Sequence, residues 1–355
     1  MSGDLPLARD LQAGAGSTPD VLISVLNWNN AALTARCIDS LLPACAGSAG
    51  AVELLVIDNG SLPTDCAALC AHAQSVGVRV LRHPDNLGFA GGHNAALREA
   101  MQRHIEFVWL VNNDALVPAG TLERLLALAR LDPRCGSVSP CLVYEDSPEV
   151  YFAGAVHDWS GLSSNWCLDP GDAEFHRVHA DGMWLVGTAL LLRTAALRNI
   201  GLLDETLFAY YEDDDIGERL CRAGWRALVC RDVALLHNRK QDSDRRRPPY
   251  FYYLMARNHA VFFLRYTPLG KRRLLRMRLV GRAVNQAQQL HALGHVELAE
   301  AALLGSHDGI VGVMGRPDLS RSVPLWFRVL AALLRLANAA QSLLKRRVPG
   351  VLGRV

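Results

Sequence analysis

Continuous apolar runs alternate with helix-like segments over the first third of the chain. Val21–Leu26 and Val52–Ile57 are predicted to be strands buried on both faces, and Val78–Leu81 and Phe107–Val111 are predicted to be the third and fourth strands. Helical spacing separates them, from about 31 to 42, between the second and third runs, and near 93–102. This alternation predicts an α/β fold in which a mostly parallel sheet is flanked by helices.

The pattern changes twice farther along the chain. Between about 130 and 180 it is weak, with short strand-like pieces at 136–143 and 150–152, and Leu185–Arg193 is then predicted to be another buried strand. After His237 it is helical, over 250–265, 274–293 and 326–344. We therefore predict a flexible N-terminal arm (1–20), an α/β domain (21–245) and a helical C-terminal region (246–355).

Polar clusters follow the predicted strands of the first third. They are Asn27-Trp28-Asn29, Asp58-Asn59, Arg82-His83 and Asn112-Asn113-Asp114. In parallel sheets, ligands bind beyond the carboxyl ends of the strands. The sequence therefore predicts a ligand site on this rim.

Four consecutive carboxylates, Glu212 to Asp215, begin a segment with helical spacing that stops at Gly224. The helix dipole favours carboxylates in a first turn and keeps them ionised, a setting that suits a general base. The alternative is an acidic helix start supported by Asp215–Arg219 and Glu218–Arg222 pairs.

Two shorter motifs leave alternatives open. Asn112-Asn113-Asp114 supplies oxygen ligands for part of a Mg²⁺ or Mn²⁺ shell, or else forms a simple Asx-turn. The turn from Gly88 to Gly92 is neither a P-loop nor a GxGxxG fingerprint. Its glycines allow either a close approach to phosphate or close helix–sheet packing.

Taken in order, these segments resemble family 2 glycosyltransferases, in particular the rhamnosyltransferase-like branch that builds bacterial surface polysaccharides. The resemblance spans about residues 20 to 265. It rests on Val25–Asn29, Val56–Ser61, Asn86–Asn94, Leu110–Asp114, Gly187–Arg193, Gly201–Glu205, Phe208–Asp215, Ala223–Trp225 and His237.

The resemblance implies a GT-A fold with a C-terminal helical extension, a nucleotide-sugar donor, a divalent cation (Mg²⁺ or Mn²⁺) and inversion at the anomeric carbon. The nucleotide half would cover about 21–118 and the acceptor half about 119–245. The resemblance assigns Asp213 as the general base and Glu212 as a group that orients the acceptor. Asp215 would mainly hold the helix through Arg219, and Asp214 has no assigned role.

The resemblance also implies binding roles. Asp58 would accept the N3–H of uracil or thymine, and Asp114, with His237, would ligate the metal. Asn112 stands where the family's DxD motif has its first Asp. The remaining donor contacts would be Asn27, Asn29, Asn86, Gly91, Asn94 and Asn113, and Trp184 and Trp225 would lie near the acceptor.

Composition adds constraints on partners. The formal net charge is only +2, and no nucleic-acid reading module accompanies the basic residues, so nucleic-acid binding is not expected. Residues 324–336 combine an apolar face with arginines and precede Lys345-Arg346-Arg347. This is typical of a helix on an anionic membrane, although a helix packed on the domain or in a homodimer fits equally. The absence of a signal peptide or an apolar spanning run favours the cytoplasm, with peripheral contact at the inner membrane face.

The sequence thus predicts an inverting, metal-dependent glycosyltransferase. It would move a deoxyhexose, rhamnose from a dTDP (or UDP) donor, onto a glycan or lipid-linked acceptor during surface-polysaccharide synthesis. Two alternatives were weighed. A sugar nucleotidyltransferase needs a basic, glycine-rich loop after its first strand, which Asn27–Asn30 does not supply. A degenerate scaffold or glycan-binding subunit would bind nucleotide without turnover.

Overall fold

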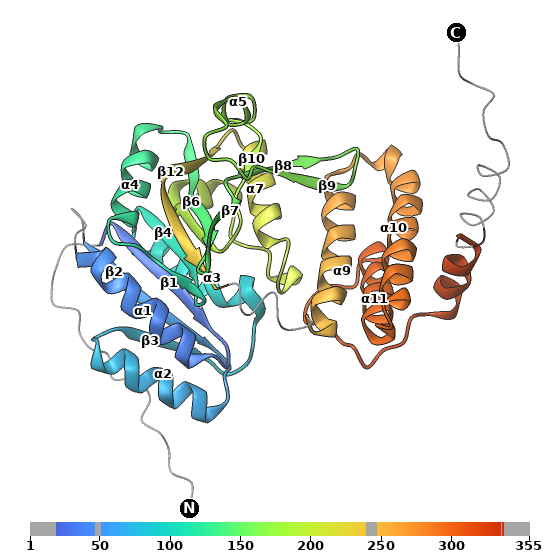
Figure 1. The fold of residues 1–355 in the computed structure, drawn as a ribbon, viewed down its shortest axis with the longest axis horizontal. Helices are drawn as coiled ribbons and strands as arrows, with labels where there is room; N and C mark the ends of the chain where they lie inside the picture. Colours follow the sequence, from blue (N-terminus) through green and yellow to red (C-terminus); the bar gives the residue numbers. More distant parts are fainter. Residues whose placement is uncertain (1–18, 47–50, 239–246, 335, 337–355) are drawn as a thin grey trace, which may run out of the picture.

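The computed structural model describes residues 19–46, 51–238, 247–334 and 336 of the 355-residue chain. Strands with their covering helices form one side of the molecule, and three long C-terminal helices form the other (Figure 1). Almost all of the predicted N-terminal arm lies outside the described residues. So do Lys345–Arg347 and most of the second half of the helix predicted over 326–344.

The main sheet, within the described residues, has nine strands in the order β3-β2-β1-β4-β11-β6-β12-β5, with β7 beside β6. Its strands are β1 (Val21–Asn27), β2 (Val52–Asn59), β3 (Arg79–His83), β4 (Phe107–Asn112), β5 (Ala115–Leu116), β6 (Cys135–Tyr144), β7 (Ser147–Phe152), β11 (Ala189–Arg193) and β12 (Arg226–His237). Strands β3, β2, β1, β4, β6 and β12 run in one direction, and β5, β7 and β11 run against them. The mostly parallel sheet is therefore confirmed.

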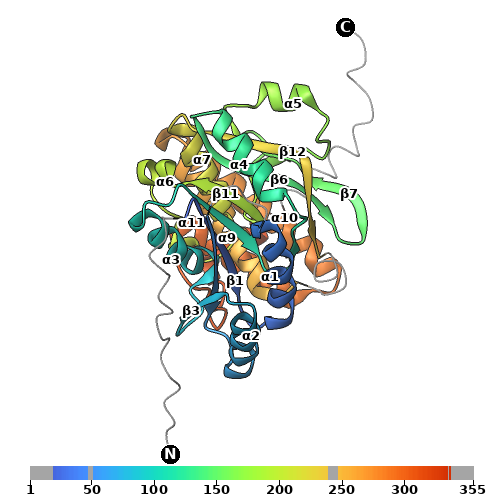
Figure 2. The same cartoon turned by 90° about the vertical axis from the view of Figure 1, so that its left-hand side faces the viewer.

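Helices cover both faces of this sheet, as the alternating pattern predicted. On one face α1 (Ala31–Ala46) contacts α4 (Thr121–Leu131), and α2 (Pro63–Ser75) packs along α1 and β3. On the other face α3 (Gly88–Gln102) contacts α6 (Thr194–Ile200), which contacts α7 (Glu212–Arg222). Figure 2 shows α1 and α3 on opposite sides of β1. The apolar runs of β1, β2 and β4 are buried because both faces of these strands are covered, whereas β3, at the end of the sheet, is partly exposed.

The strand predicted over Leu185–Arg193 is shorter than expected. The chain forms β10 (Met183–Trp184) in a small antiparallel sheet with β8 (Ala155–Asp158) and β9 (Ser163–Trp166), and then β11 in the main sheet. Because the chain changes sheets here, residues 185–188 continue neither strand. Around this part lie the short helices α5 (Ala173–Val178) and η1 (Glu205–Leu207).

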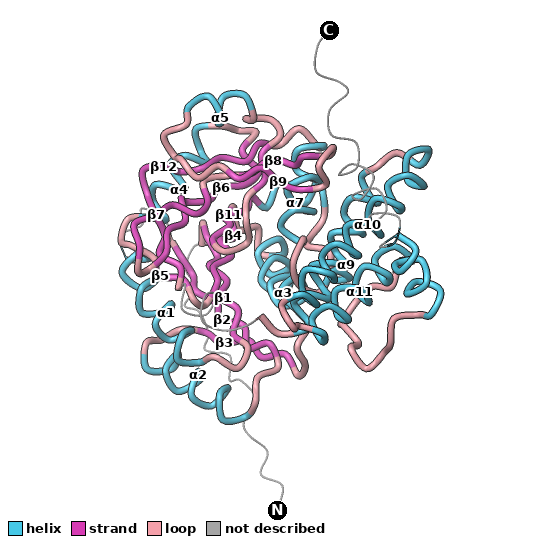
Figure 3. Tube along the Cα trace, turned by 45° about the vertical axis from the view of Figure 1, so that its right-hand side comes forward, coloured by secondary structure: helices cyan, strands magenta, loops and turns pink. Residues whose placement is uncertain are grey.

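The C-terminal region packs three helices around their own apolar core. These are α9 (Pro249–Tyr266), α10 (Arg272–Ala292), which follows the single turn η2 (Leu269–Lys271), and α11 (Val296–Val311). A short helix over 325–334 adds Phe327 to that core. In Figure 3, α3 and α7 lie between the strands and these helices. Among the described residues, no helix is long and apolar enough to cross a membrane.

Helix α11 was not predicted from the sequence. It crosses α9 so closely that a Cβ on Gly305 would lie 2.1 Å from the carbonyl oxygen of Tyr253, and one on Gly309 would lie 2.3 Å from that of Arg257. The two glycines lower the intrinsic helix propensity of the segment. They also permit the backbone contact that stabilises the helix in the folded protein.

Candidate active site

The polar rim predicted from the strand ends is present. Asn27 lies opposite Asp58 in the β1–β2 register, and Leu26 lies opposite Asn112 in the β1–β4 register. Strand order reverses between β1 and β4, because β2 and β3 lie on one side of β1 and β4 lies on the other. This is the position at which open α/β sheets leave a crevice for ligands.

Asp58 is completely buried at this rim. Its Oδ1 accepts a hydrogen bond from Nδ2 of Asn27 at 3.1 Å, and Nε of Arg82 lies 3.4 Å from its Oδ2. Oδ2 has no hydrogen-bond partner among the described residues. A buried carboxylate oxygen in this state calls for a donor from a ligand or water, so the geometry suits the base-reading role predicted for Asp58.

Asn27 orients its neighbours. Its amide nitrogen also lies 3.1 Å from Oγ of Ser61 and 3.0 Å from Oδ2 of Asp65, and its Oδ1 accepts a hydrogen bond from Thr34 at 2.7 Å. The side chain is fully buried and surrounded by these protein partners. Asn27 therefore holds Asp58 in place.

The other predicted donor-binding amides also make protein contacts. Asn29 accepts from the N–H of Leu62 at 2.7 Å, and Asn113 donates to Oγ1 of Thr34 at 2.9 Å. Asn94 is buried and bonds both the N–H and the carbonyl of Leu203, so its role in the structure is to hold the 203–205 segment. Asn86 accepts a hydrogen bond from the N–H of Gly88 at 2.8 Å. It lines the cavity described below, whereas Asn29, Asn94 and Asn113 do not.

The glycine turn is packed against protein atoms. A Cβ on Gly88 would lie 2.1 Å from the carbonyl oxygen of Phe208, and one on Gly92 would lie 2.4 Å from Cδ1 of Leu26. Gly91 is buried, and its Cβ would lie 2.8 Å from that of Leu87. Of the two interpretations left open by the sequence, the geometry supports close packing at these three positions. A phosphate contact by Gly91 stays a prediction.

The two predicted metal ligands come together from distant parts of the chain. Asp114 lies between β4 and β5, His237 ends β12, and the β12–β5 pairing brings Nε2 of His237 to 3.2 Å from Oδ1 of Asp114. No group of three or more His, Cys, Asp or Glu side chains in the described part of the chain could hold a metal. Two protein ligands still fit Mg²⁺ or Mn²⁺, because these ions usually take further oxygens from water and substrate phosphates.

The four carboxylates occupy the first turn of α7, as predicted, and they have different surroundings. Asp213 is half-buried, with Oδ2 accepting from the N–H of Gly187 at 2.9 Å and Oδ1 from the N–H of Asp214 at 3.0 Å. Asp215 is buried against Arg219 (2.8 Å), Arg265 (2.6 Å) and the hydroxyl of Tyr266 (2.7 Å). The predicted pairs Asp215–Arg219 and Glu218–Arg222 are both present.

Burial changes the ionisation expected for these groups. It raises the pKa of Asp213, although hydrogen bonds from the N–H groups of Gly187 and Asp214 oppose the rise. The pKa values of Glu212 and Asp214 lie well above their ordinary values, because of burial and then the negative charge of Asp213. Burial thus outweighs the helix dipole, and Asp213 is the member of this trio best stabilised as a carboxylate.

The loop before α7 has an unusual backbone. Residues 207–211, which we call the tyrosine loop, include Phe208, Tyr210 and Tyr211 with φ of 68°, 68° and 71°. At Phe208 (ψ −67°) the chain makes a γ-turn, with the N–H of Ala209 bonded to the carbonyl of Leu207 at 2.9 Å. This form of the γ-turn is rare and strained.

Two residues of α9 hold the tyrosine loop, and sequence reasoning missed both. The amide of Asn258 lies 2.9, 2.9 and 2.8 Å from the carbonyls of Leu207, Ala209 and Tyr210. Arg257, completely buried, donates to the carbonyl of Leu207 at 2.7 Å and also bonds that of Gly315. An adjacent Arg-Asn pair inside an apolar helix was the available signal, because such groups are buried only when they have partners.

The two tryptophans predicted near the acceptor do not share one site. Trp184 is buried beside α7, where its ring stacks on that of His157 with centroids 5.4 Å apart. Trp225 follows α7 and bonds Asn199. The 11-residue helix separates Trp225 from Glu212 by about 16 Å. Trp225 therefore lies at the opposite end of α7 from Asp213, and an acceptor contact by either tryptophan stays a prediction.

A cavity of about 340 Å³, which we call the rim cavity, lies between the carboxyl ends of the strands and α9. Trp28 and Asn86 contribute from the rim, Phe208 and Tyr210 from the tyrosine loop, and Arg316 from the segment after α11. Trp28 is 45% exposed. The cavity thus joins both parts of the molecule, and Tyr210 and Arg316 were not among the predicted site residues.

Comparisons with known proteins agree with this arrangement. Residues 21–201 match the model of the family described as Glycosyl transferase family 2. The N-acetylglucosaminyl-diphospho-decaprenol L-rhamnosyltransferase of Mycobacterium tuberculosis is 27% identical over 216 residues, covering 55% of this chain and 69% of that protein. Galactofuranosyltransferase GlfT1 of the same species is 28% identical over 190 residues, covering 52% and 60%.

Among solved structures, Staphylococcus aureus TarS 1–349 in complex with UDP-GlcNAc superposes with a TM-score of 0.54 at 17% identity. The match covers 90% of this chain and 87% of that chain. At this identity the likeness shows the fold alone. Together with the sheet and helices described above, it confirms the GT-A architecture.

Proposed function

We propose a function for this chain, which belongs to glycosyl transferase family 2, in its rhamnosyltransferase-like branch, and is a glycosyltransferase. It transfers a deoxyhexose, rhamnose from a dTDP or UDP donor, with inversion and with a divalent cation, onto a glycan or lipid-linked acceptor of a surface polysaccharide. The observation that carries this proposal is the meeting of Asp114 and His237 at 3.2 Å. They meet at the carboxyl ends of the parallel strands, where Asp58 and Asn112 also lie.

In the proposed mechanism, Asp58 reads the base and Asn27 holds Asp58. Asp114 and His237 hold the cation, which when bound would stabilise the negative charge of the departing diphosphate. Asp213 accepts the proton of the acceptor hydroxyl as the new glycosidic bond forms. The N–H donors of Gly187 and Asp214 support this role, since they stabilise the carboxylate that takes the proton.

The ionisation of the α7 carboxylates gives this mechanism a pH dependence. A general base works only when deprotonated, and burial raises the pKa of Asp213. The rate should therefore fall with decreasing pH at a higher pH than the ordinary pKa of an aspartate, about 4, would give. A pH profile of kcat would measure this acid limb.

The test is a transfer and donor-hydrolysis assay over UDP-, GDP- and dTDP-sugars with Mn²⁺ or Mg²⁺. We expect turnover with one donor class and a loss of kcat of about 10²- to 10⁴-fold in Asp213→Asn. Glu218→Gln is the matched control, because Glu218 lies on the same helix in a pair with Arg222. No turnover with any donor, or full activity of Asp213→Asn, would contradict the proposal. Nucleotide binding without turnover would favour a degenerate scaffold.

The short helix over 325–334 supports membrane contact as part of this function. It packs through Phe327 and Ala331, so the packing expected from the sequence is present. Leu325, Val329 and Leu333 are 77, 50 and 59% exposed, at the spacing of one helix face. We propose that this face lies on an anionic membrane that carries the acceptor. Co-sedimentation with anionic vesicles, lost in Val329→Glu, would test it.

A further inference from the structure

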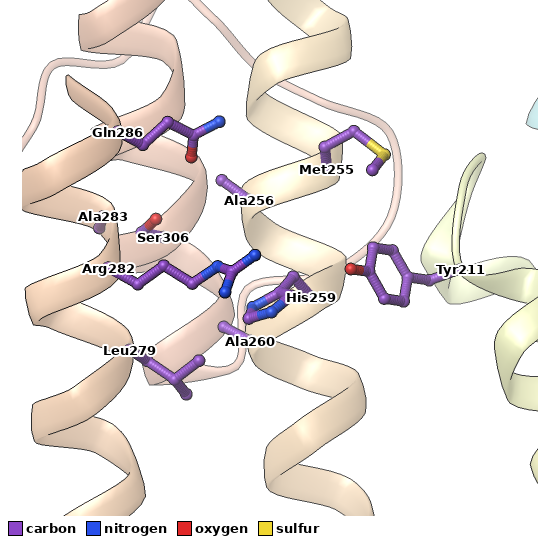
Figure 4. A pocket seen from close by; sticks show the side chains of 10 residues that line it. All are labelled: Tyr211, Met255, Ala256, His259, Ala260, Leu279, Arg282, Ala283, Gln286 and Ser306. Carbon is purple, nitrogen blue, oxygen red and sulfur yellow. The ribbon is translucent and has the colours of Figure 1, made fainter. Parts of the chain in front are cut away.

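A second cavity, of about 100 Å³, lies within the helical region beside the tyrosine loop (Figure 4). We call it the helix cavity. Its polar lining consists of Tyr211, His259, Arg282, Gln286 and Ser306. A cavity needs only about 10–15 Å³ to hold one water. The helix cavity is therefore large enough for a small polyatomic group.

The helix cavity and the rim cavity lie on opposite faces of α9. Tyr250 and Leu254 face the rim cavity, and Met255, Ala256 and His259 face the helix cavity. At 100° per residue these two sets point in roughly opposite directions. A ligand in the helix cavity would therefore not compete with one in the rim cavity.

The polar lining of the helix cavity consists mainly of hydrogen-bond donors without partners. Arg282 is exposed, Gln286 and Tyr211 are half-buried and Ser306 is buried, and none of the four side chains has a hydrogen bond or an ion pair with a described residue. Figure 4 shows the Arg282 guanidinium and the Tyr211 hydroxyl extending toward α9 from different sides. No carboxylate lines the cavity. An arginine with hydroxyl and amide donors, and no acidic side chain among them, is suited to an anion.

His259 does not add a charge to this lining. Its Nε2 lies 2.9 Å from the carbonyl of Leu162, and burial lowers its pKa to about 4. The ring is therefore neutral near pH 7 and donates from Nε2 to that carbonyl. The positive charge available to a ligand comes from Arg282.

Tyr211 connects the helix cavity to the proposed base. It immediately precedes Glu212, and Asp213 follows within about 7 Å of chain. Burial raises the pKa of Tyr211, the charge of Asp214 raises it further, and Arg282 opposes the rise. The phenol thus lies between the α7 carboxylates and the Arg282 cation.

We propose that the helix cavity binds a phosphoryl group carried by the acceptor, with Arg282 as its main contact. The inference rests on the proposed function, since an acceptor must place one hydroxyl at Asp213. Its phosphoryl group could then occupy the helix cavity beside Tyr211, while the donor occupies the other face of α9. The planar guanidinium of Arg282 suits two parallel hydrogen bonds to two oxygens of one phosphate, and the hydroxyl of Tyr211 and the amide of Gln286 add neutral donors.

The test compares two acceptors that carry the same sugar on a short lipid chain, one with a diphosphate link and one without phosphate. One is a polyprenyl diphosphate-linked N-acetylglucosamine with a short prenyl chain, and the other is octyl N-acetylglucosaminide. Arg282→Gln should raise KM for the diphosphate acceptor about 10- to 100-fold, the effect of losing a charged hydrogen bond. KM for the octyl glycoside and the rate of donor hydrolysis should not change. Arg282→Lys should retain part of the affinity.

Arg273→Gln is the matched control. Arg273 is an exposed arginine of the same helix, lies nine residues away on its opposite face, and does not line the helix cavity. The Arg273→Gln substitution removes the same charge and should leave the KM values for both acceptors unchanged. An equal effect of the two variants, an equal change for both acceptors, or no change in Arg282→Gln would overturn the inference.

A binding measurement keeps the inference separate from the proposed function. If the unaltered protein turns over no donor, the proposed function fails, and titration of the protein with inorganic pyrophosphate still tests the cavity. Binding that is weakened in Arg282→Gln and retained in Arg273→Gln supports an anion site. Binding that is equal in all three proteins, or absent, overturns it. If inorganic phosphate binds at Arg282 but changes kcat equally with both acceptors, the site serves a free effector and the acceptor assignment is wrong.

Discussion

Two chain reversals meet at the proposed active site, and they reach left-handed backbone conformations by different means. The glycine turn, which forms the start of α3, uses Gly88, with φ of 75°, where no side chain opposes that conformation. The tyrosine loop before α7 reaches φ near 70° at Phe208, Tyr210 and Tyr211, which carry large aromatic side chains. Such positions cost of order 1–3 kcal/mol each and persist only where surrounding structure fixes them.

Hydrogen bonds from neighbouring elements hold the tyrosine loop. Each carbonyl from Leu207 to Tyr211 accepts a hydrogen bond. Asn258 serves three of them, and the N–H of Ala90 in α3 bonds that of Phe208 at 3.3 Å. The glycine turn therefore maintains its conformation locally, whereas the tyrosine loop depends on α9 and on the glycine turn itself. The helical region therefore fixes the position of the proposed base.

The largest effect should come from breaking the contact between the two turns. Gly88→Ala places a methyl group where the carbonyl oxygen of Phe208 would be only 2.1 Å away, at a φ that an L-residue rarely adopts. Backbone strain and overpacking should together lower the free energy of unfolding by about 3–5 kcal/mol. Urea unfolding, followed by circular dichroism, measures the change.

Gly77→Ala isolates the strain component. Gly77 has nearly the same φ, 72°, but a Cβ there would have no atom within 4 Å. Its cost should be only about 1–2 kcal/mol. Equal costs at Gly77 and Gly88 would mean that the contact between the turns does not matter for stability.

A smaller effect is expected from removing the hydrogen bonds of Asn258. Asn258→Ala leaves the carbonyls of Ala209 and Tyr210 without their bonds from this amide and should cost about 2–3 kcal/mol. Because the loop then moves relative to the rim, kcat should fall more than donor affinity does. Thermal unfolding and steady-state kinetics measure the two quantities.

Asn285→Ala is the control for this prediction. Asn285 is exposed on α10, and surface substitutions usually change stability by less than about 0.5 kcal/mol. If Asn258→Ala lost stability but kept its kcat, the amide would stabilise the fold without positioning the base.

The parts of the fold that local patterns specify could be predicted from the sequence. The strands β1, β2 and β4 appear as apolar runs because both faces of each are covered, and their polar ends define the rim. The change of sheet between β10 and β11 could not be predicted, because Leu185–Arg193 is mostly apolar and strand pairing in the folded protein decides where β11 begins. Helix α11 was missed because its glycines act through a contact with α9.

The same division applies to the site. Asp58, Asp114, Asp213 and His237 were identified because motif order along the chain carries them, and Asp114 and His237 do meet. Arg257, Asn258 and Arg282 lie outside those motifs. Their importance depends on which loop or cavity they face, and no local pattern encodes that.

The smallest effect should come from a substitution of Glu212, the first residue of α7 after the tyrosine loop. Glu212 is buried, its Oε2 lacks a hydrogen bond within the described residues, and its pKa lies well above the ordinary value because of burial and the charge of Asp213. A carboxyl with a raised folded-state pKa destabilises the fold increasingly as pH rises above the unfolded-state pKa of about 4.3, and the penalty is complete once pH exceeds the folded-state pKa. Glu212→Gln should therefore raise Tm at pH 8, and the gain should disappear as pH falls toward 4. A gain that is independent of pH would show that packing, and not buried charge, distinguishes this end of the tyrosine loop.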